Sequence, residues 1–331
     1  MERSPTLDLS RWSDVPLGVN RRRWVIVSTG LRQLFRLRFF KLLLAAAWGA
    51  GTLIGLAGFV FSQSVATGGW LERFADNIGP RAEAVVSALG AFVLLYPDIV
   101  VGGVFTAIFW AHSFIGLWLS LLALTVMVPQ LITRDRASNA LVMYLSRPLT
   151  SADYLLGKLG MIAGLLVVVW TGPLLFGWLL SMAFATNRDF IVHSFEPLLR
   201  ALAFNGVALV ALSAIALGVS ALGRQSRVTI VIWVCLCVVL GVMGTPPHSP
   251  AWIKRMSFTH NLGEVRAQVL NFDDALTVAG NQLPLLDRDF ASELKQAGAR
   301  ASGNDFQGAL VALGLFIVGS SFVFTRRLRP E

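Results

Sequence analysis

Long apolar runs alternate with short polar segments along the whole chain. A helix of about 20 residues covers the roughly 30 Å hydrocarbon core of a bilayer. Six runs are long enough to be membrane-spanning helices. They are residues 42–63, 102–131, 159–182, 199–222, 228–244 and 307–324. The pattern predicts an all-α polytopic membrane protein with six transmembrane helices.

The stretch 84–132 allows a second interpretation, because its only charge is Asp98 and it is long enough for two spans. Two spans here would make seven in total and would place the basic segments of the chain on opposite sides of the membrane. Pro97-Asp98 is the turn signal within the stretch. We therefore expect a short re-entrant or surface helix at 84–96, followed by the span 102–131.

Residues 1–41 are predicted to be a cytoplasmic lead-in followed by an amphipathic helix in the membrane interface. Apolar residues at spacings of three and four form one face of this helix. They are Trp24, Val27, Leu31, Leu34 and Phe35. The predicted membrane-surface residues are Arg22, Trp24, Arg32 and Arg36. The alternative is that the segment is only the polar prefix of the first span.

A polar segment, residues 133–158, separates the second and third spans. Its middle, 140–145, is apolar again, and Pro148 disfavours helical geometry at Arg147. Thr150 or Ser151 can cap the helix that leads into the third span. The patterning predicts a short helix, a proline-led turn and the start of another helix, which is more structure than a plain connection needs.

Charge gives the orientation of these spans. The chain of 331 residues is 55% hydrophobic and 14% charged, with a net charge of +9 and a mean hydropathy of +0.65. With six spans, four of the polar segments lie on the same side of the membrane. All four are net positive: 21–41, 133–158, 224–227 and 326–329. Basic residues prefer the cytoplasmic side. We expect both termini to be cytoplasmic in a plasma (inner) membrane, and no nucleic-acid motif accompanies the charge.

Between the fifth and sixth spans lies a polar segment, 245–306, which is predicted to be extracytoplasmic. Helical periodicity recurs at 262–270 and at 290–297. The predicted organisation has four parts. They are the lead-in and interfacial helix 1–41, spans one to five 42–244 with the loop 133–158, the extracytoplasmic segment 245–306, and span six with its tail 307–331.

Catalytic and metal-binding patterns are absent from the sequence. The four histidines are scattered, and Cys235 and Cys237 would point away from each other on a helix. Gly157-Lys158 is not a phosphate-binding loop, because Ala152 and Leu159 replace the glycine and the hydroxyl residue that such a loop needs. The chain is predicted not to be an enzyme and to bind no metal or cofactor itself.

The loop 133–158 resembles a known signature. Asp135, the run Leu145-Ser146-Arg147-Pro148 and the run Tyr154-Leu155-Leu156-Gly157-Lys158 resemble permease subunits of ATP-binding-cassette (ABC) transporters of the type-2 exporter branch. Many members have Gly-Thr where this chain has Ser138-Asn139-Ala140. The amphipathic entry helix, the six spans and the position of the loop fit the same family.

The resemblance implies that the loop holds a cytoplasmic coupling helix, which docks on a separate ATPase subunit. The implied partners are two copies of that ABC ATPase subunit, a second copy of this permease or a related permease, and membrane lipid, but not nucleic acid. ATP–Mg would bind in the ATPase, and this chain would export an unidentified substrate. The implied ATPase-docking residues are Arg134, Asp135, Arg136, Leu141, Tyr144, Leu145, Arg147, Pro148, Asp153 and Lys158.

Two other functions fit the same sequence. The chain could be a non-transporting membrane scaffold or assembly factor that acts through residues 245–306. A membrane-embedded enzyme is a third interpretation, and the missing catalytic groups count against it.

Overall fold

The structure is a computed structural model, and it describes residues 18–64, 69–137, 151–185, 187–223, 225–243, 250–282, 288–301 and 305–328. These residues form helices and no strand. The elements are α1 (Val19–Phe35), α2 (Arg38–Ser64), α3 (Trp70–Ile78), α4 (Pro80–Leu95), α5 (Pro97–Met127), η2 (Val128–Gln130), α6 (Thr133–Ala137), α8 (Ser151–Leu166), η3 (Val167–Thr171), α9 (Gly172–Ala183), α10 (Arg188–Leu222), α11 (Ser226–Met243), α12 (Ala251–Met256), α13 (Phe258–Leu270), α14 (Phe272–Gln282), α15 (Arg288–Ala301) and α16 (Phe306–Leu328).

Five helical stretches are long and apolar enough to cross a membrane. They are Arg38–Ser64, Pro97–Asp135, Asp153–Ala183, Arg188–Leu222 and Phe306–Arg326. The predicted span 228–244 coincides with α11, whose apolar stretch Ser226–Val239 is shorter. The polytopic helical architecture is therefore confirmed, and a crossing by α11 stays a prediction.

The helix α4 is separate from α5, as the turn signal at Pro97 predicts. Gly79, with φ of 134°, lets the chain reverse between α3 and α4, because only glycine adopts this conformation without strain. Pro97 occupies the first turn of α5. The helix α5 consequently starts at Pro97, earlier than the expected residue 102. Whether α4 is re-entrant or lies on a membrane surface stays a prediction.

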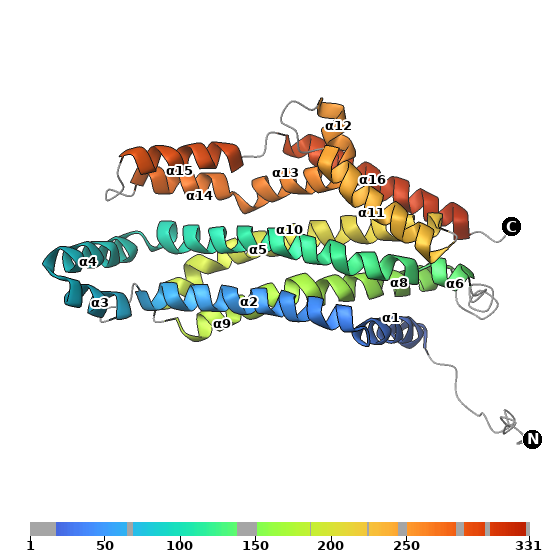
Figure 1. Cartoon of the computed structure of the whole chain (residues 1–331), viewed down its shortest axis with the longest axis horizontal. Coiled ribbons are helices and arrows are strands. Elements are labelled where there is room, and N and C mark those ends of the chain that lie inside the picture. The colour runs from blue at the N-terminus through green and yellow to red at the C-terminus, as the bar shows by residue number, and fades with distance from the viewer. Residues whose placement is uncertain are drawn as a thin grey trace, which may run out of the picture.

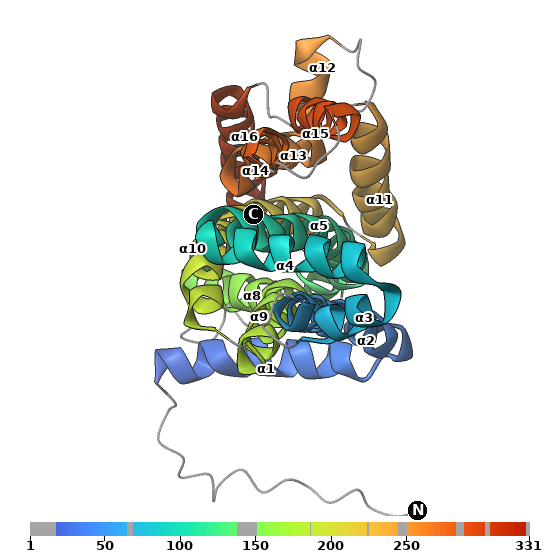
Figure 2. The same cartoon turned by 90° about the vertical axis from the view of Figure 1, so that its left-hand side faces the viewer.

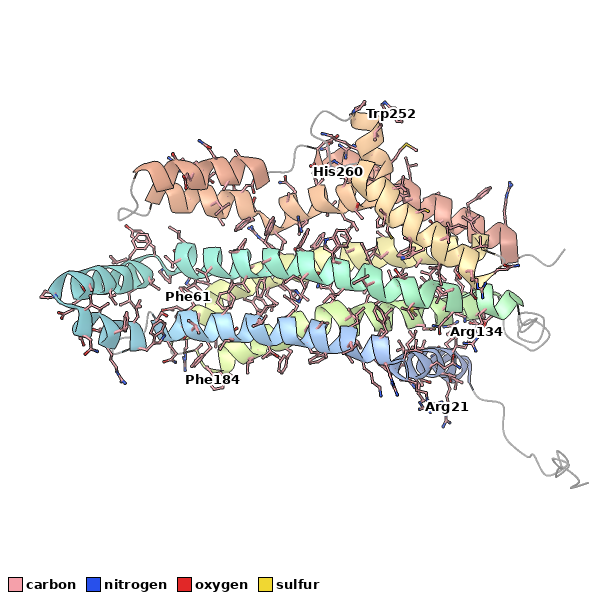
Figure 3. The ribbon with its side chains drawn as sticks, in the orientation of Figure 1. Arg21, Phe61, Arg134, Phe184, Trp252 and His260 are labelled. Atoms are coloured by element: carbon pink, nitrogen blue, oxygen red, sulfur yellow. The ribbon has the colours of Figure 1, made fainter. Side chains whose placement is uncertain are left out.

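The described parts of the four net-positive segments 21–41, 133–158, 224–227 and 326–329 lie at one end of the bundle (Figure 1). This end, called the basic end, holds α1, α6, the first turn of α8, the start of α11 and the end of α16. The opposite end, called the distal end, holds α3, α4, α14 and α15. Figure 3 shows the same separation, with Arg21 and Arg134 at the basic end and Phe61 and Phe184 toward the other. Placement of the basic segments on a common side therefore agrees with the charge pattern.

The helix α1 lies across the bundle. It is seen end-on in Figure 1 and lengthwise in Figure 2, so it runs roughly perpendicular to the long helices. A helix in the plane of a membrane has this orientation relative to spanning helices.

Helices α2 and α9 pack through small residues. A Cβ added to Gly51 would lie 2.5 Å from the carbonyl oxygen of Pro173, and one added to Gly177 would lie 2.4 Å from the carbonyl oxygen of Gly51. The hydroxyl of Ser181 donates to the carbonyls of Gly177, at 2.9 Å, and Ile54, at 3.3 Å. Small residues let backbones of membrane helices approach closely, and this contact joins the first and third predicted spans.

The segment 245–306 is not simply a surface segment. Phe258, Leu262 and Val265 of α13 are fully buried, and they join the main apolar core, which also contains Phe204 of α10 and Leu313 of α16. The helix α13 thus belongs to the bundle, whereas α14 and α15 form a helical pair at the distal end (Figure 1).

The contact between α2 and α9 gives a matched pair of glycine substitutions. In a helix interior, alanine is more favourable than glycine by about 1 kcal/mol. Gly49→Ala should therefore not lower stability, because nothing lies within 4 Å of the new Cβ. Gly51→Ala should lower the thermal unfolding midpoint in detergent, because overpacking costs about 1–3 kcal/mol. Equal midpoints for the two variants would contradict this packing.

Candidate functional site

The two helices that flank residues 138–150 are joined by a buried ion pair. Lys158 Nζ of α8 lies 2.7 Å from Oδ2 of Asp135 on α6. The hydroxyl of Tyr154 donates to the same Asp135 oxygen at 2.7 Å. Lys158 and Tyr154 are 7% and 2% exposed, and Lys158 Nζ lies 5.4 Å from the centre of the Tyr154 ring. Charge, hydrogen bond and ring therefore hold α6 against the first turns of α8.

A second ion pair ties α8 to α1. The Arg23 side chain donates to Asp153 Oδ1 through Nε, at 2.9 Å, and through Nη2. Asp153 is only 7% exposed, although it lies in the first turn of α8. An acidic residue at this position also interacts favourably with the positive end of the helix dipole.

Glycines of α8 accept the apolar side chains of α1. A Cβ at Gly157, Gly160 or Gly164 would lie 3.0–3.1 Å from the side chains of Ile26, Val27 and Leu31, respectively. The Gly160-xxx-Gly164 spacing indicates close packing, and the structure shows that the neighbour is α1. The crossing helix α1 is thus attached to α8 by packing as well as by charge.

Hydroxyl groups join the start of α6 to α10 and α11. Thr133 Oγ1 donates to the carbonyl of Ser220 at 2.8 Å and lies 3.0 Å from Thr229 Oγ1. The amide of Ile132 donates to Ser220 Oγ at 2.8 Å. Thr133, Ser220 and Thr229 are fully buried. These hydrogen bonds attach the start of α6 to α10 and α11.

The predicted ATPase-docking residues divide into three groups. Asp135, Asp153 and Lys158 form ion pairs within this chain, and their contact with an ATPase stays a prediction. Arg134 is exposed. The remaining positions lie outside the described residues, apart from Arg136, which is on α6 but whose side chain is not described. They are Leu141, Tyr144, Leu145, Arg147 and Pro148. Docking stays a prediction for Arg134 and for these positions.

Three of the predicted membrane-surface residues are exposed on α1. Trp24 is 65% exposed, and Arg32 and Arg36 are exposed as well, while the Arg22 side chain is not described. The apolar face of α1 contacts α8 through Val27 and Leu31 rather than being left for lipid. Membrane contact by Trp24, Arg32 and Arg36 stays a prediction.

The sequence did not indicate that Arg23, Tyr154 or the hydroxyl groups of Thr133, Ser220 and Thr229 bind residues of other helices. Tyr154 lies within the motif that carries the family resemblance, which was a usable signal. Arg23 is one of several arginines in its segment, and Ser220 and Thr229 lie in apolar runs. Only the packing of the helices selects these residues from their neighbours.

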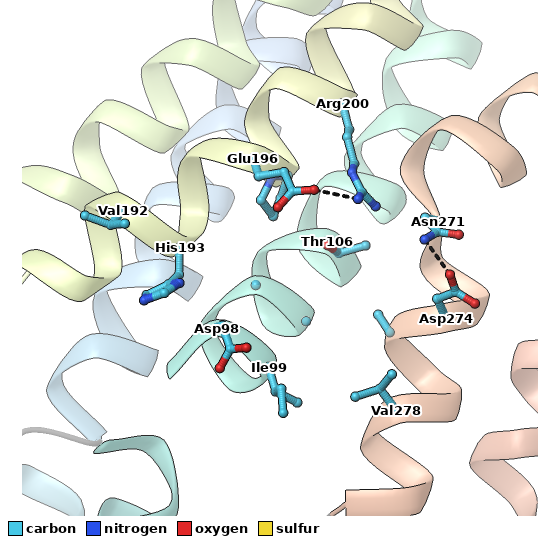
Figure 4. Close-up of a pocket in the computed structure, with 14 residues that line it drawn as sticks. Asp98, Ile99, Thr106, Val192, His193, Glu196, Arg200, Asn271, Asp274 and Val278 are labelled. Carbon is cyan, nitrogen blue, oxygen red and sulfur yellow. Dashed lines mark hydrogen bonds and ion pairs between the residues drawn. The ribbon is translucent and has the colours of Figure 1, made fainter. Parts of the chain in front are cut away.

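A separate polar cavity of about 420 Å³ lies toward the distal end, between α5, α10 and α14. Asp98, His193, Glu196 and Asp274 face it, as Figure 4 shows. Glu196 pairs with Arg200 at 2.6 Å, and Asn271 donates to Asp274 at 2.6 Å. No group of three His, Cys, Asp or Glu able to hold a metal ion occurs in the part of the chain that the structure describes.

These features define the class of protein as a polytopic α-helical membrane protein with a loop anchored at its basic end. The family model for "ABC-2 family transporter protein" matches residues 114–318, which is more than half of the chain. The chain therefore belongs to the ABC-2 transporter family and is a permease-type membrane component of an ABC transporter. No curated protein matches it.

The ion pair between Asp135 and Lys158 can be tested by a double-mutant cycle. Lys158→Met should destabilise the protein by up to about 3–5 kcal/mol, because it removes the ammonium group that pairs with the largely buried Asp135 carboxylate. Adding Asp135→Asn should recover part of that loss, giving a coupling energy between about 0.5 and 3 kcal/mol. The measurement is the thermal unfolding midpoint of the purified protein in detergent.

Arg32→Gln serves as the control, since Arg32 is exposed at the same end and its loss should leave the midpoint unchanged. Strict additivity of the Asp135 and Lys158 substitutions would show that the two side chains do not interact.

Proposed function

We propose that this chain is the permease subunit of an ABC exporter and that the loop 133–158 is its coupling element. ATP–Mg would be bound and hydrolysed by a separate nucleotide-binding subunit. The observation that carries the proposal is the anchoring of both flanks of the loop, through Asp135–Lys158 on one side and Arg23–Asp153 on the other.

Anchoring of this kind suits the transmission of force. A loop with free flanks would absorb a displacement by bending. Here α6 continues α5 through η2, and α8 continues into η3 and α9, so the flanks of the loop extend directly into two long apolar stretches. Because Lys158 binds Asp135, the two stretches would be pushed together rather than independently.

The other helices of the basic end would follow the same displacement. Thr133 connects α6 to α10 and α11, and Arg23 connects α8 to α1. We infer that the docked ATPase moves α1, α5, α8, α10 and α11 as one unit. The substrate would be carried outward as this unit changes its angle to the rest of the bundle.

The proposed assembly contains two copies of the ATPase subunit and a second permease, either a copy of this chain or a related one. The proposed location is the plasma (inner) membrane, with both termini in the cytoplasm. Arg21, Arg134 and the C-terminal end of α16, which carries Arg326, lie at one end of the bundle. This grouping supports the orientation, because basic residues are retained on the cytoplasmic side.

The alternative function, a scaffold acting through residues 245–306, has less support. Phe258, Leu262 and Val265 of this segment belong to the core of the bundle. A helix built into the core suits a part of the transmembrane machinery better than an independent binding module.

Docking can be tested by co-purification of this chain with its nucleotide-binding subunit. Leu145→Asp and Arg147→Glu should each reduce the ATPase recovered with the tagged permease by tenfold or more, a loss of about 1.4 kcal/mol. A buried charge at an apolar contact or a reversed charge at its rim has this effect on an interface. The readouts are the ratio of the two subunits and the permease-stimulated ATPase rate.

Lys295→Glu is the matched control, because Lys295 is exposed on α15 at the distal end and should not affect recovery. Wild-type association in both loop variants, with correct folding, would refute the coupling role of this loop. Loss of association in the Lys295 variant would point instead to the segment 245–306.

A further inference from the structure

A second cavity, of about 560 Å³, lies in the wedge between α5, α11 and α13. Figure 2 shows α11 standing apart from α5, with α13 on the same side of the bundle. This cavity is called the α5–α11 groove, and it is separate both from the loop at the basic end and from the polar cavity of Figure 4.

Contacts between helices define the two limits of the groove. Toward the basic end, Trp233 Nε1 of α11 donates to Thr125 Oγ1 of α5 at 3.1 Å. At the other limit, α13 approaches α11, where a Cβ at Gly241 would lie 3.4 Å from Thr259 Oγ1. Since α5 and α11 touch at one limit and α13 covers the other, the space between them is a defined pocket.

The walls of the groove are apolar and reach the surface of the protein. Phe114, Trp118 and Leu121 of α5 and Val238 of α11 line it. Phe114 and Trp118 are 49% and 51% exposed, and Val238 is 54% exposed. On a membrane-spanning helix, side chains with this exposure face lipid, so a hydrocarbon chain can enter from the side without crossing water.

The ionisable side chains that line the groove, cysteine aside, are all on α12 and α13, at one limit of the groove. They are Lys254, His260 and Arg266, and no carboxylate is among the described lining residues. Burial lowers the pKa of His260 below its ordinary value, and Glu264 at 3.6 Å opposes that shift only in part. At neutral pH the positive charge at the groove therefore comes from Lys254 and Arg266.

Arg266 has unused hydrogen-bonding capacity. Its guanidinium lies 4.8 Å from the centre of the Trp110 ring and 5.5 Å from that of Phe114. Its Nε is buried without a hydrogen-bond partner, and no described carboxylate forms an ion pair with it. A buried donor without a partner is costly, and an anionic oxygen would satisfy it with a strong charge-assisted bond.

The level of Arg266 along the bundle fits a lipid headgroup. The apolar stretch Pro97–Asp135 contains 39 residues, but about 20 suffice to cross the hydrocarbon core. Counting about 20 residues from Asp135 puts the far side of that core near Phe114, inside the predicted span 102–131, and on that basis we place Trp110 and Arg266 at the distal membrane interface. Aromatic and basic side chains are both stable at this level.

We propose that the α5–α11 groove binds an anionic membrane lipid of the distal leaflet. Its phosphate is held at Arg266 and Lys254, and an acyl chain lies between Phe114 and Trp118 of α5 and Val238 of α11. The proposal depends on the membrane-spanning helices alone and not on docking of an ATPase.

The test measures lipid binding to the purified full-length chain in detergent, without an ATPase subunit. Phosphatidylglycerol and phosphatidylcholine are titrated separately, and the bound lipid is counted by native mass spectrometry. Wild-type protein should bind phosphatidylglycerol at least tenfold more tightly than phosphatidylcholine. Arg266→Gln should weaken phosphatidylglycerol binding about tenfold or more.

A steric variant keeps the test independent of the arginine. Gly263 lines the groove, and nothing lies within 4 Å of a Cβ placed there. Gly263→Leu should fold normally and fill the groove, which should reduce phosphatidylglycerol binding tenfold or more. The controls are Gly206→Leu, at another open glycine, on α10, and Arg73→Gln, at an exposed arginine of α3. Both should bind as wild type does.

A third measurement uses inorganic phosphate alone in place of the lipid. It records the thermal unfolding midpoint of the protein as phosphate is added. The proposal expects no shift at phosphate concentrations in the low millimolar range. A shift with phosphate alone that is lost in Arg266→Gln but retained in Gly263→Leu would identify an anion site and overturn the lipid assignment. Equal binding of both lipids, or wild-type binding in both groove variants, would overturn it as well.

Discussion

The ion pair between Lys158 and Asp135 is the interaction on which the basic end of this protein depends. Neither charge is stable when buried alone, and each is satisfied by the other together with the hydroxyl of Tyr154. The pair holds α6 beside α8, the helices that precede and follow residues 138–150. Arg23 and Thr133 extend the same connection to α1, α10 and α11, so the end carrying the family signature is the end most closely tied together.

At the distal end, two of the long helical stretches extend further than a bilayer requires. The stretches Pro97–Asp135 and Arg188–Leu222, of 39 and 35 residues, exceed the roughly 20 that a bilayer requires. Their extra length supports α3, α4, α14 and α15 beyond the membrane core. The polar cavity around Glu196 and Arg200 lies near the start of α5 at Asp98, and the cationic limit of the α5–α11 groove lies beside Trp110 and Phe114. A transporter in which force is applied at one end and ligands are met toward the other is consistent with this division.

The helix α13 connects one limit of the α5–α11 groove to the core. It is only 13 residues long, and yet Phe258, Leu262 and Val265 are fully buried. Its polar side, with His260, Glu264 and Arg266, faces the groove and the distal surface. A displacement of α11 or α16 would therefore change the surroundings of Arg266, which gives a physical route from the basic end to the groove.

The sequence by itself determined the helical membrane architecture, the common side of the basic segments and the family, because hydrophobic length, charge bias and a local motif are all properties of neighbouring residues. It also placed small residues at Gly51, Gly160 and Gly164, without indicating that α9 and α1 would be their partners. The tertiary structure decided which charges pair within the chain: Asp153 binds Arg23, and Lys158 binds Asp135. It also decided that α13 enters the core and that a groove lies between α5 and α11. Such pairings join residues far apart in the chain, and no local spacing records them, because they arise only when the helices pack.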